Sequence, residues 1–343
     1  MKSIPSHLWR ALGACALIAT IAAGISAFAR TPLQAQGQQA APQMSEAENQ
    51  AVTAINTAVD AAAKLAAAEE FIKKYPKSSG RMMVARHVGA EIAQVQDLAQ
   101  RIGLLEKFQT VFTGAGEAET VTIALLDAYL KADRIDDAFS AAATHISKNP
   151  GDVTTLTQMA LIGVEQAKSQ NTKFLEQSQD YGMKAIGLIE TDTRPETIEL
   201  LQWSEYKTRW LPQLYQSMGL LSYIGGNRAD AKSKLEKAAS LNQTDPFNYL
   251  LLGSLVNDEY QQMAMQHKGM ADGPDKDELL KKAHAKMDEV VELYAQVIAL
   301  SEGKLEYQQL HDQLMQDFQA YYQYRHNNST DGMRELIDKY KKP

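Results

Sequence analysis

The stretch MGLLSYIGGNRADAKSKLEKAASL, residues 218–241, decides the fold that the sequence predicts. Its small residues stand at the spacing needed where two helices touch. Gly219 lets two helices approach closely, and Ala231 and Ala238 leave room for the second helix to pack against the first. Gly226 lies between the two segments, where the chain must turn. The stretch therefore predicts two helices packed side by side and joined by a tight turn.

Segments on both sides repeat this pattern. One match spans residues 125–150, a second begins at Leu156 and includes the segment 174–189, and the next first helix follows at 249–256. An earlier and weaker unit, LAAAEEFIKKYP, occupies residues 65–76. Strict alternation of apolar and polar residues is absent, which argues against strands. Because a single amphipathic helix cannot bury its apolar stripe alone, the successive helices must stack.

This spacing resembles the tetratricopeptide repeat, a helix-turn-helix unit of about 34 residues. The resemblance covers residues 46–301 loosely and residues 119–256 more specifically. It implies an all-α fold, an α-solenoid of antiparallel helix pairs. Beyond Val256 the sequence departs from the repeat, because residues 257–273 form a polar, methionine-rich insertion before a long helix. We therefore expect a helical C-terminal cap.

The first residues have the layout of an export signal. Lys2 and Arg10 precede an uncharged, apolar run, and Ala27-Phe28-Ala29 offers a small-x-small cleavage site. An uncleaved membrane anchor is the alternative, since the run is near the lower limit of a bilayer span. We expect cleavage after Ala29 and a protein exported to the periplasm or secreted.

Cys15 is the only cysteine, and the stretch Leu12-Gly13-Ala14-Cys15 superficially resembles a lipoprotein site. Such a site should end the apolar run, whereas this run continues beyond the cysteine. Cleavage after Ala29 would leave a chain that can form no disulfide, which suits an oxidising compartment.

A composition rich in Gln, Ala and Pro after residue 29 predicts a flexible tether. Ser45 with Glu48 three residues later predicts a capping box at the start of the first helix. The predicted domains are a signal peptide at 1–29, the tether at 30–44, a tetratricopeptide-like repeat domain at 45–301 and a helical cap at 302–343.

The charge balance and the motifs exclude several classes of function. The formal net charge is -7, and no run of Lys and Arg supplies the basic face that nucleic acids require. Gly114-Ala115-Gly116 is too short for a phosphate loop and predicts a turn. His284 and Asp288 lie one helical turn apart but lack further metal ligands at a suitable spacing, so a surface pair is the better interpretation. We expect no enzyme, no cofactor and no metal.

The resemblance implies that a protein or extended peptide binds the concave face, which the first, inner helix of each pair lines. The outer-helix residues Lys234 and Glu236 should then have no part in binding. The alternative is a cell-surface glycan-binding protein that uses the tyrosines of residues 294–324 with Trp203 and Trp210 as a stacking surface. The inner-helix positions that the resemblance assigns to partner binding are Asp127, Lys131, Thr157, Leu161, Gln213, Gln216, Tyr223, Asn257 and Asp258.

Overall fold

The computed structural model of the chain describes residues 44–341. The predicted signal peptide, Cys15 and nearly all of the predicted tether lie outside these described residues. Helices and turns make up the described part, in which no strand occurs. This part separates into two compact units between Pro150 and Gly151. None of its helices is long and apolar enough to cross a membrane.

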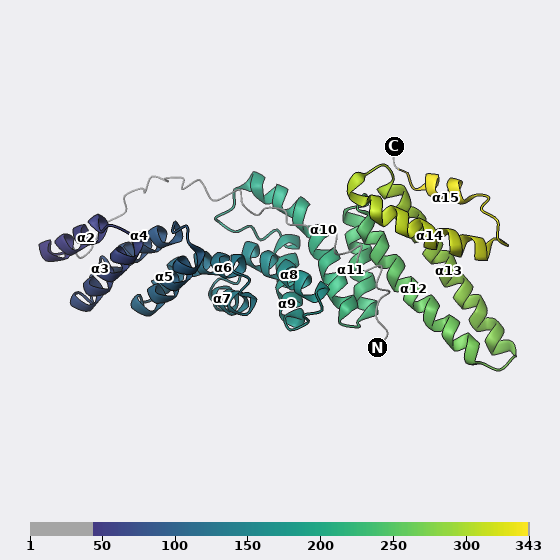
Figure 1. Ribbon diagram of the computed structural model, residues 1–343, viewed down its shortest axis with the longest axis horizontal. Coiled ribbons are helices and arrows are strands. Elements are labelled where there is room, and N and C mark those ends of the chain that lie inside the picture. The colour runs from purple at the N-terminus through teal and green to yellow at the C-terminus, as the bar shows by residue number, and fades with distance from the viewer. Residues whose placement is uncertain (1–43, 342–343) are drawn as a thin grey trace. The chain divides into compact units, whose positions relative to one another are not determined.

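The first unit, up to Pro150, consists of three helix pairs joined by short turns (Figure 1). A short 3-10 helix, η1 (Ala118–Val121), precedes the third pair, and Gly114, Ala115 and Gly116 form a turn before it, as predicted. The helices are α2 (Glu46–Thr57), α3 (Ala61–Lys74), α4 (Arg81–Ala93), α5 (Leu98–Val111), α6 (Thr122–Lys131) and α7 (Ile135–Lys148).

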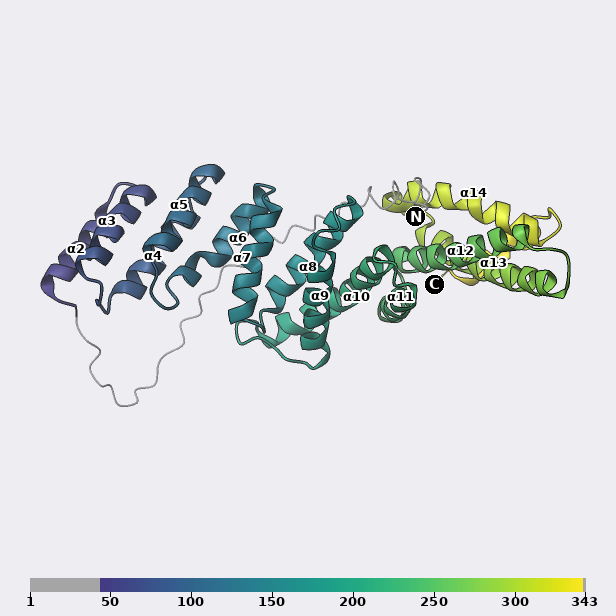
Figure 2. The ribbon, with the colours of Figure 1, turned by 90° about the horizontal axis from the view of Figure 1, so that it is seen from below.

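The second unit, from Gly151, also contains three pairs, and its longest helices are α10, α12 and α13. Both views show each pair side by side, with α14 against the last pair (Figures 1 and 2). The helices are α8 (Val153–Lys168), α9 (Leu175–Glu190), α10 (Leu200–Ile224), α11 (Arg228–Leu241), α12 (Pro246–Gly269), α13 (Pro274–Ser301), η2 (Leu305–Tyr307), α14 (Gln308–Arg325) and α15 (Met333–Lys339).

Side-chain caps begin many of these helices, because the first backbone N–H groups of a helix have no partner within it. The predicted capping box is confirmed: Ser45 N donates to Glu48 Oε2 at 2.6 Å, and Glu48 N donates to Ser45 Oγ at 3.3 Å. The residues whose side chains accept from backbone N–H groups at later helix starts are Asp60, Asp97, Asp152, Asn227 and Asp245.

The small residues of the stretch 218–241 lie where α10 packs against α11. Ala231 and Ala238 have no exposed surface, and a Cβ atom on Gly219 would lie 2.7 Å from Leu235 Cγ. Gly226 has φ +83 in the turn between the two helices, a conformation that glycine adopts without strain. Leu241, the last apolar position of the stretch, is 40% exposed and does not belong to the core. The predicted all-α stack of helix pairs is confirmed.

The prediction of an insertion that interrupts the repeat after Val256 is wrong. Residues 257–269 continue α12 without a break, and the chain turns only at Met270–Gly273 before α13 begins at Pro274. Helix α13 lies beside α12 in both views and supplies the packing partner for the longer helix (Figures 1 and 2). The last repeat pair is therefore longer than the others.

The C-terminal cap is helical, as predicted. Leu314 and Phe318 of α14 and Ile337 of α15 join one core with Val290 and Ile298 of α13. Helix α13 ends at Ser301, where the predicted boundary between repeat domain and cap falls. The prediction of one repeat domain over residues 45–301 stays a prediction.

Candidate binding site

The predicted partner-binding residues of the first unit form a local ion pair. Lys131 Nζ lies 2.7 Å from Asp127 Oδ2 on α6, and both side chains are about half exposed. An exposed pair one helical turn apart contributes little to stability. These two residues are accessible, and their role in binding stays a prediction.

On α8 the two predicted residues are largely packed. Thr157 is 3% exposed, and its hydroxyl oxygen lies within hydrogen-bond distance of Tyr206 Oη, at 2.8 Å. Leu161 is half-buried, as is Gln213 on α10. Tyr206 also donates to the Val153 carbonyl oxygen at 3.1 Å, so it ties α10 to α8. Thr157 therefore serves the contact between helices.

The remaining predicted residues connect α10 to α12 and α12 to α14. Gln216 Nε2 donates to Asp245 Oδ2 at 2.8 Å and to Asn248 Oδ1 at 2.9 Å. Tyr223 Oη donates to Asp258 Oδ2 at 2.8 Å. Burial and the Asp258 charge raise the pKa of Tyr223, so its hydroxyl stays protonated.

Asn257 Oδ1 accepts from Tyr321 Oη at 2.9 Å, which brings α14 into the same network. These inner-helix groups already have hydrogen-bond partners within the protein, and their role in binding stays a prediction. Their polar atoms hold helices together.

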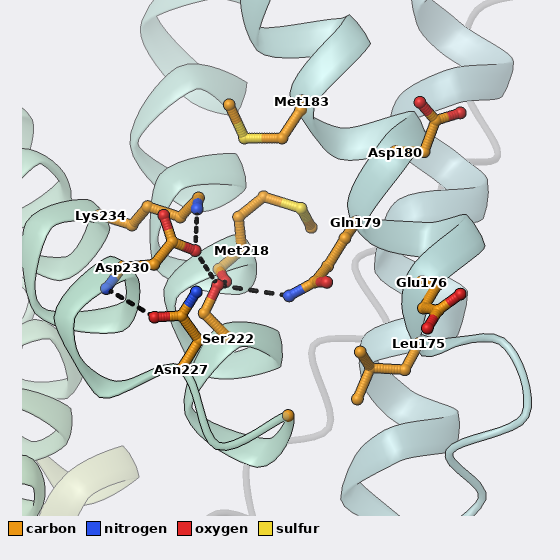
Figure 3. Close-up of a pocket in the computed structure, with 11 residues that line it drawn as sticks. Leu175, Glu176, Gln179, Asp180, Met183, Met218, Ser222, Asn227, Asp230 and Lys234 are labelled. Carbon is orange, nitrogen blue, oxygen red and sulfur yellow. Dashed lines mark hydrogen bonds and ion pairs between the residues drawn. The ribbon is translucent and has the colours of Figure 1, made fainter.

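A pocket lies instead between α9, α10 and the beginning of α11 (Figure 3). Its volume is about 480 Å³. Glu176 and Asp180 come from α9 on one side, Asp230 and Lys234 come from α11 on the other, and Ser222 of α10 lies between them. The other lining residues are Leu175, Gln179, Met183, Met218, Gly225 and Asn227.

Close packing of α9 on α10 forms the apolar part of this pocket. A Cβ atom on Gly182 would lie 2.2 Å from Met218 Sδ, so the glycine lets the methionine side chain reach across to α9. Met218 itself is fully buried, whereas Met183 is 43% exposed at the rim. The pocket thus combines a thioether surface with polar groups, as many ligand sites do.

Ser222 links the three helices at the bottom of the pocket (Figure 3). Its Oγ lies 2.6 Å from Asp230 Oδ2 and 2.8 Å from the Met218 carbonyl oxygen, and it accepts from Gln179 Nε2 at 3.3 Å. Lys234 Nζ donates to the same Asp230 Oδ2. Burial raises the pKa of Asp230, but the hydrogen bonds from Lys234 and Ser222 outweigh it and hold the pKa below its usual value.

Asp230 is therefore ionised at neutral pH. The lining contains the three carboxylates of Glu176, Asp180 and Asp230 against one ammonium group, that of Lys234. The pocket is accordingly negative.

The sequence prediction missed this pocket and gave Lys234 no part in binding. One local signal was present: Asn227, Asp230 and Lys234 stand three and four residues apart, so they share one face of α11. Their partner surface on α9 lies some 50 residues earlier in the chain, and the sequence alone does not bring the two together.

The aromatic residues proposed as a glycan platform are mostly buried or half-buried. Trp203 is 1% exposed, Tyr294 2% and Tyr322 6%. The Tyr321 ring stacks on Tyr294 with 6.3 Å between centroids. Trp210, Tyr307 and Tyr321 are half-buried, and Tyr324 is 61% exposed. Tyr294, Tyr321 and Tyr322 pack in the core of the C-terminal helices, whereas Trp203 and Trp210 lie on α10, so the rings do not form one exposed surface and the geometry does not favour the glycan alternative.

His284 and Asp288 do not form a metal site. Both Asp288 oxygens accept hydrogen bonds from Arg325 of α14, at 2.6 and 2.9 Å. Across residues 44–341, no group of three or more His, Cys, Asp or Glu side chains is placed to hold a metal ion.

The helix pairs and the cap define the class of this fold as an all-α repeat of antiparallel helix pairs, similar to a tetratricopeptide repeat. The chain matches no protein-family model and no curated protein sequence. It is similar to a solved thermophilic tetratricopeptide-repeat protein of Thermus thermophilus, at 15% identity and a TM-score of 0.32 over 70% of this chain and 98% of that chain.

Two further solved structures are similar. A tetratricopeptide repeat protein from Parabacteroides merdae has 11% identity and a TM-score of 0.34, covering 86% of this chain and 98% of that chain. A monomeric mutant of IFIT1 with m7Gppp-AAAA has 13% identity and a TM-score of 0.36, covering 82% of this chain and 55% of that chain. These TM-scores are too low to infer a function for this chain from the solved structures. The assignment to the all-α helical repeats rests on the helix pairs of the chain itself.

Proposed function

We propose that the protein is a non-enzymatic scaffold that holds a segment of another protein against its helix pairs. The observation that carries this proposal is the pocket between α9, α10 and α11, because it is large enough for a side chain and open to solvent-exposed helix surface. Stacked helix pairs offer long exposed surfaces on which an extended chain can continue beyond such a pocket.

Catalysis has little support at this pocket. Its lining contains no histidine or cysteine. The Ser222 hydroxyl belongs to a side chain that is 1% exposed and lies within hydrogen-bond distance of a backbone carbonyl oxygen and of Asp230. Asp230 has a lowered pKa, which makes it a poor base for activating a nucleophile.

The partner is proposed to be a protein or an extended peptide, with no nucleic acid and no cofactor. The place of binding distinguishes two versions of this proposal: the pocket between α9 and α11, or the inner-helix face that includes Gln216 and Asp258. The side chains of Gln216 and Asp258 already make hydrogen bonds to neighbouring helices. We therefore favour the pocket.

Selection of short random peptides on the purified protein tests the proposal. Peptides that bind should lose affinity when Met183→Trp fills the pocket, because the indole would take the space at its rim. Ser233→Trp, on an exposed position of α11 outside the pocket, is the matched control and should leave affinity unchanged. Failure to select any peptide that binds the folded protein would contradict the scaffold proposal.

A second variant tests the inner-helix version. Gln216→Glu combined with Asp258→Lys should lower the melting temperature, because both side chains make hydrogen bonds between helices. If this variant lost the selected peptides while Met183→Trp kept them, the inner face would be the binding site and the pocket would not.

We further propose that the protein acts outside the cytoplasm, in the periplasm or secreted. The basic residues Lys2 and Arg10, the apolar run and the cleavage site at Ala29 support this location. N-terminal sequencing of the native exported protein should begin at or near Arg30. An intact Met1 on membrane-bound protein would indicate an anchor, and an acylated Cys15 would contradict both.

A further inference from the structure

We infer that the pocket between α9, α10 and α11 receives the guanidinium group of an arginine side chain from the bound protein segment. This inference rests on the proposed function, and it specifies which side chain of the partner the pocket selects.

The hydrogen-bonding groups that remain open in the pocket are mainly acceptors. The Glu176 carboxylate makes no hydrogen bond within residues 44–341. Asp230 Oδ2 accepts hydrogen bonds from Lys234 and Ser222, whereas Asp230 Oδ1 has no partner in the described structure. Gln179 Nε2 donates a hydrogen bond to Ser222, and Gln179 Oε1 remains available as an acceptor. The Lys234 ammonium is already paired with Asp230. A ligand that supplies several donors would satisfy these groups.

The net negative charge of the lining favours a cationic ligand. Two of the three carboxylates have a lysine partner: Asp230 pairs with Lys234, and Asp180 pairs with Lys184, whose side chain is 53% exposed. Such an exposed ion pair is weak and can be exchanged for another cation. A neutral or anionic side chain would leave the Glu176 carboxylate without a partner among residues 44–341.

The size and the walls of the pocket favour a long side chain over a bare ion. A volume of about 480 Å³ greatly exceeds that of a monatomic cation. Leu175, Met183 and Met218 supply apolar surface against which an aliphatic stem can pack. The end group should be a guanidinium, because its five N–H donors in a planar fork can reach several separated acceptors at once, which the compact ammonium group of lysine cannot do.

The experiment compares one selected peptide in three forms: with its arginine, with lysine in its place, and with citrulline, which keeps the shape without the charge. Calorimetric titration into the purified protein should give an affinity at least about tenfold lower for both substituted peptides, since charge-assisted and bidentate hydrogen bonds are lost.

The double variant Glu176→Gln with Asp180→Asn should weaken the arginine peptide by a similar factor and leave the citrulline peptide unchanged. Both residues are exposed on α9, so the fold should not change. Glu236→Gln, which removes an exposed carboxylate of α11 outside the pocket, is the control and should affect neither peptide.

Two results would overturn the inference, and they differ in what they mean for the scaffold. Selected peptides without arginine, or with an affinity that the double variant does not change, would remove the arginine pocket and leave the scaffold proposal standing. The absence of any selected peptide would remove both.

Discussion

Ala238 and Lys237 are neighbours with opposite surroundings. Ala238 has no exposed surface where α11 packs on α10, whereas Lys237 is exposed, with its Nζ 5.9 Å from the centroid of the Tyr215 ring. Ala238→Arg should lower the free energy of unfolding by about 3 kcal/mol or more, because it adds volume and an unpaired charge to a packed contact. Lys237→Ala should cost little. Urea unfolding of the two variants measures the difference, and the reverse ranking would show that the register of the repeat is wrong.

Gly219 and Gly187 both lie inside helices, yet only one of them faces another helix. A Cβ atom on Gly219 would lie 2.7 and 2.9 Å from Leu235 Cγ and Cδ2 and 3.3 Å from the Ala231 carbonyl oxygen. A Cβ atom on Gly187 would meet nothing within 4 Å.

The same substitution should therefore have opposite effects at these two glycines. Gly219→Ala should destabilise the protein by about 1–3 kcal/mol through overpacking. Gly187→Ala should stabilise it by about 0.5–1 kcal/mol, because alanine loses less conformational freedom in a helix. Thermal unfolding followed by circular dichroism provides the test; destabilisation by both would mean that α9 is packed at Gly187 as well.

At the scale of an element, a buried ion pair fixes the start of α4 to the segment before η1. Arg81 Nε and Nη2 each lie 2.7 Å from an oxygen of Glu117, which is 4% exposed and also accepts from Gly114 N at 2.9 Å. The hydrogen bond from Arg81 is the main reason that the pKa of Glu117 lies below 4.5, its usual value.

This pair should make the stability depend on pH. A carboxylate with a lowered pKa contributes stability that is fully present above the unfolded value and is lost as the pH falls through the folded value. Glu117→Gln should therefore be less stable than the natural protein at pH 7, and the difference should shrink below about pH 4.5. Urea unfolding over a pH series measures it, with the exposed Glu70→Gln as a control that should change little. A difference that stays constant with pH would contradict the prediction.

Most elements of the fold could be predicted because their signals are local. Capping residues, apolar stripes at helical spacing and glycine turns all act within a few residues, and they located the helix pairs at 125–150, 156–189 and 218–241. The pair α4 and α5 was not predicted from the sequence. The stretch after Val256 was misread because it lacks an apolar stripe, although its Gln, Met, Ala and Lys residues are good helix formers. With α13 beside it, that propensity is enough to continue the helix.

The candidate site could not be predicted in the same way, because it depends on contacts between distant residues. Gln179 and Ser222 are separated by 43 positions and Asn257 and Tyr321 by 64, and polar side chains on a helix look the same in sequence whether they face solvent or a neighbouring helix.

At the scale of the whole molecule, each unit contains the packing partners of its own helices. In the second unit, α13, α14 and α15 share one core that includes Val290, Ile298, Phe318 and Ile337. A fragment of residues 151–343 should therefore fold alone, with a helical circular dichroism spectrum and a single cooperative melt.

In helical-repeat proteins the stability is close to a sum over the repeats and the contacts between them. The first unit has shorter helices, none longer than the 14 residues of α3, α5 and α7, so a fragment of residues 44–150 should melt at a lower temperature. Equal melting temperatures would contradict this ranking, and a non-cooperative melt of the longer fragment would show that its core requires residues before Gly151.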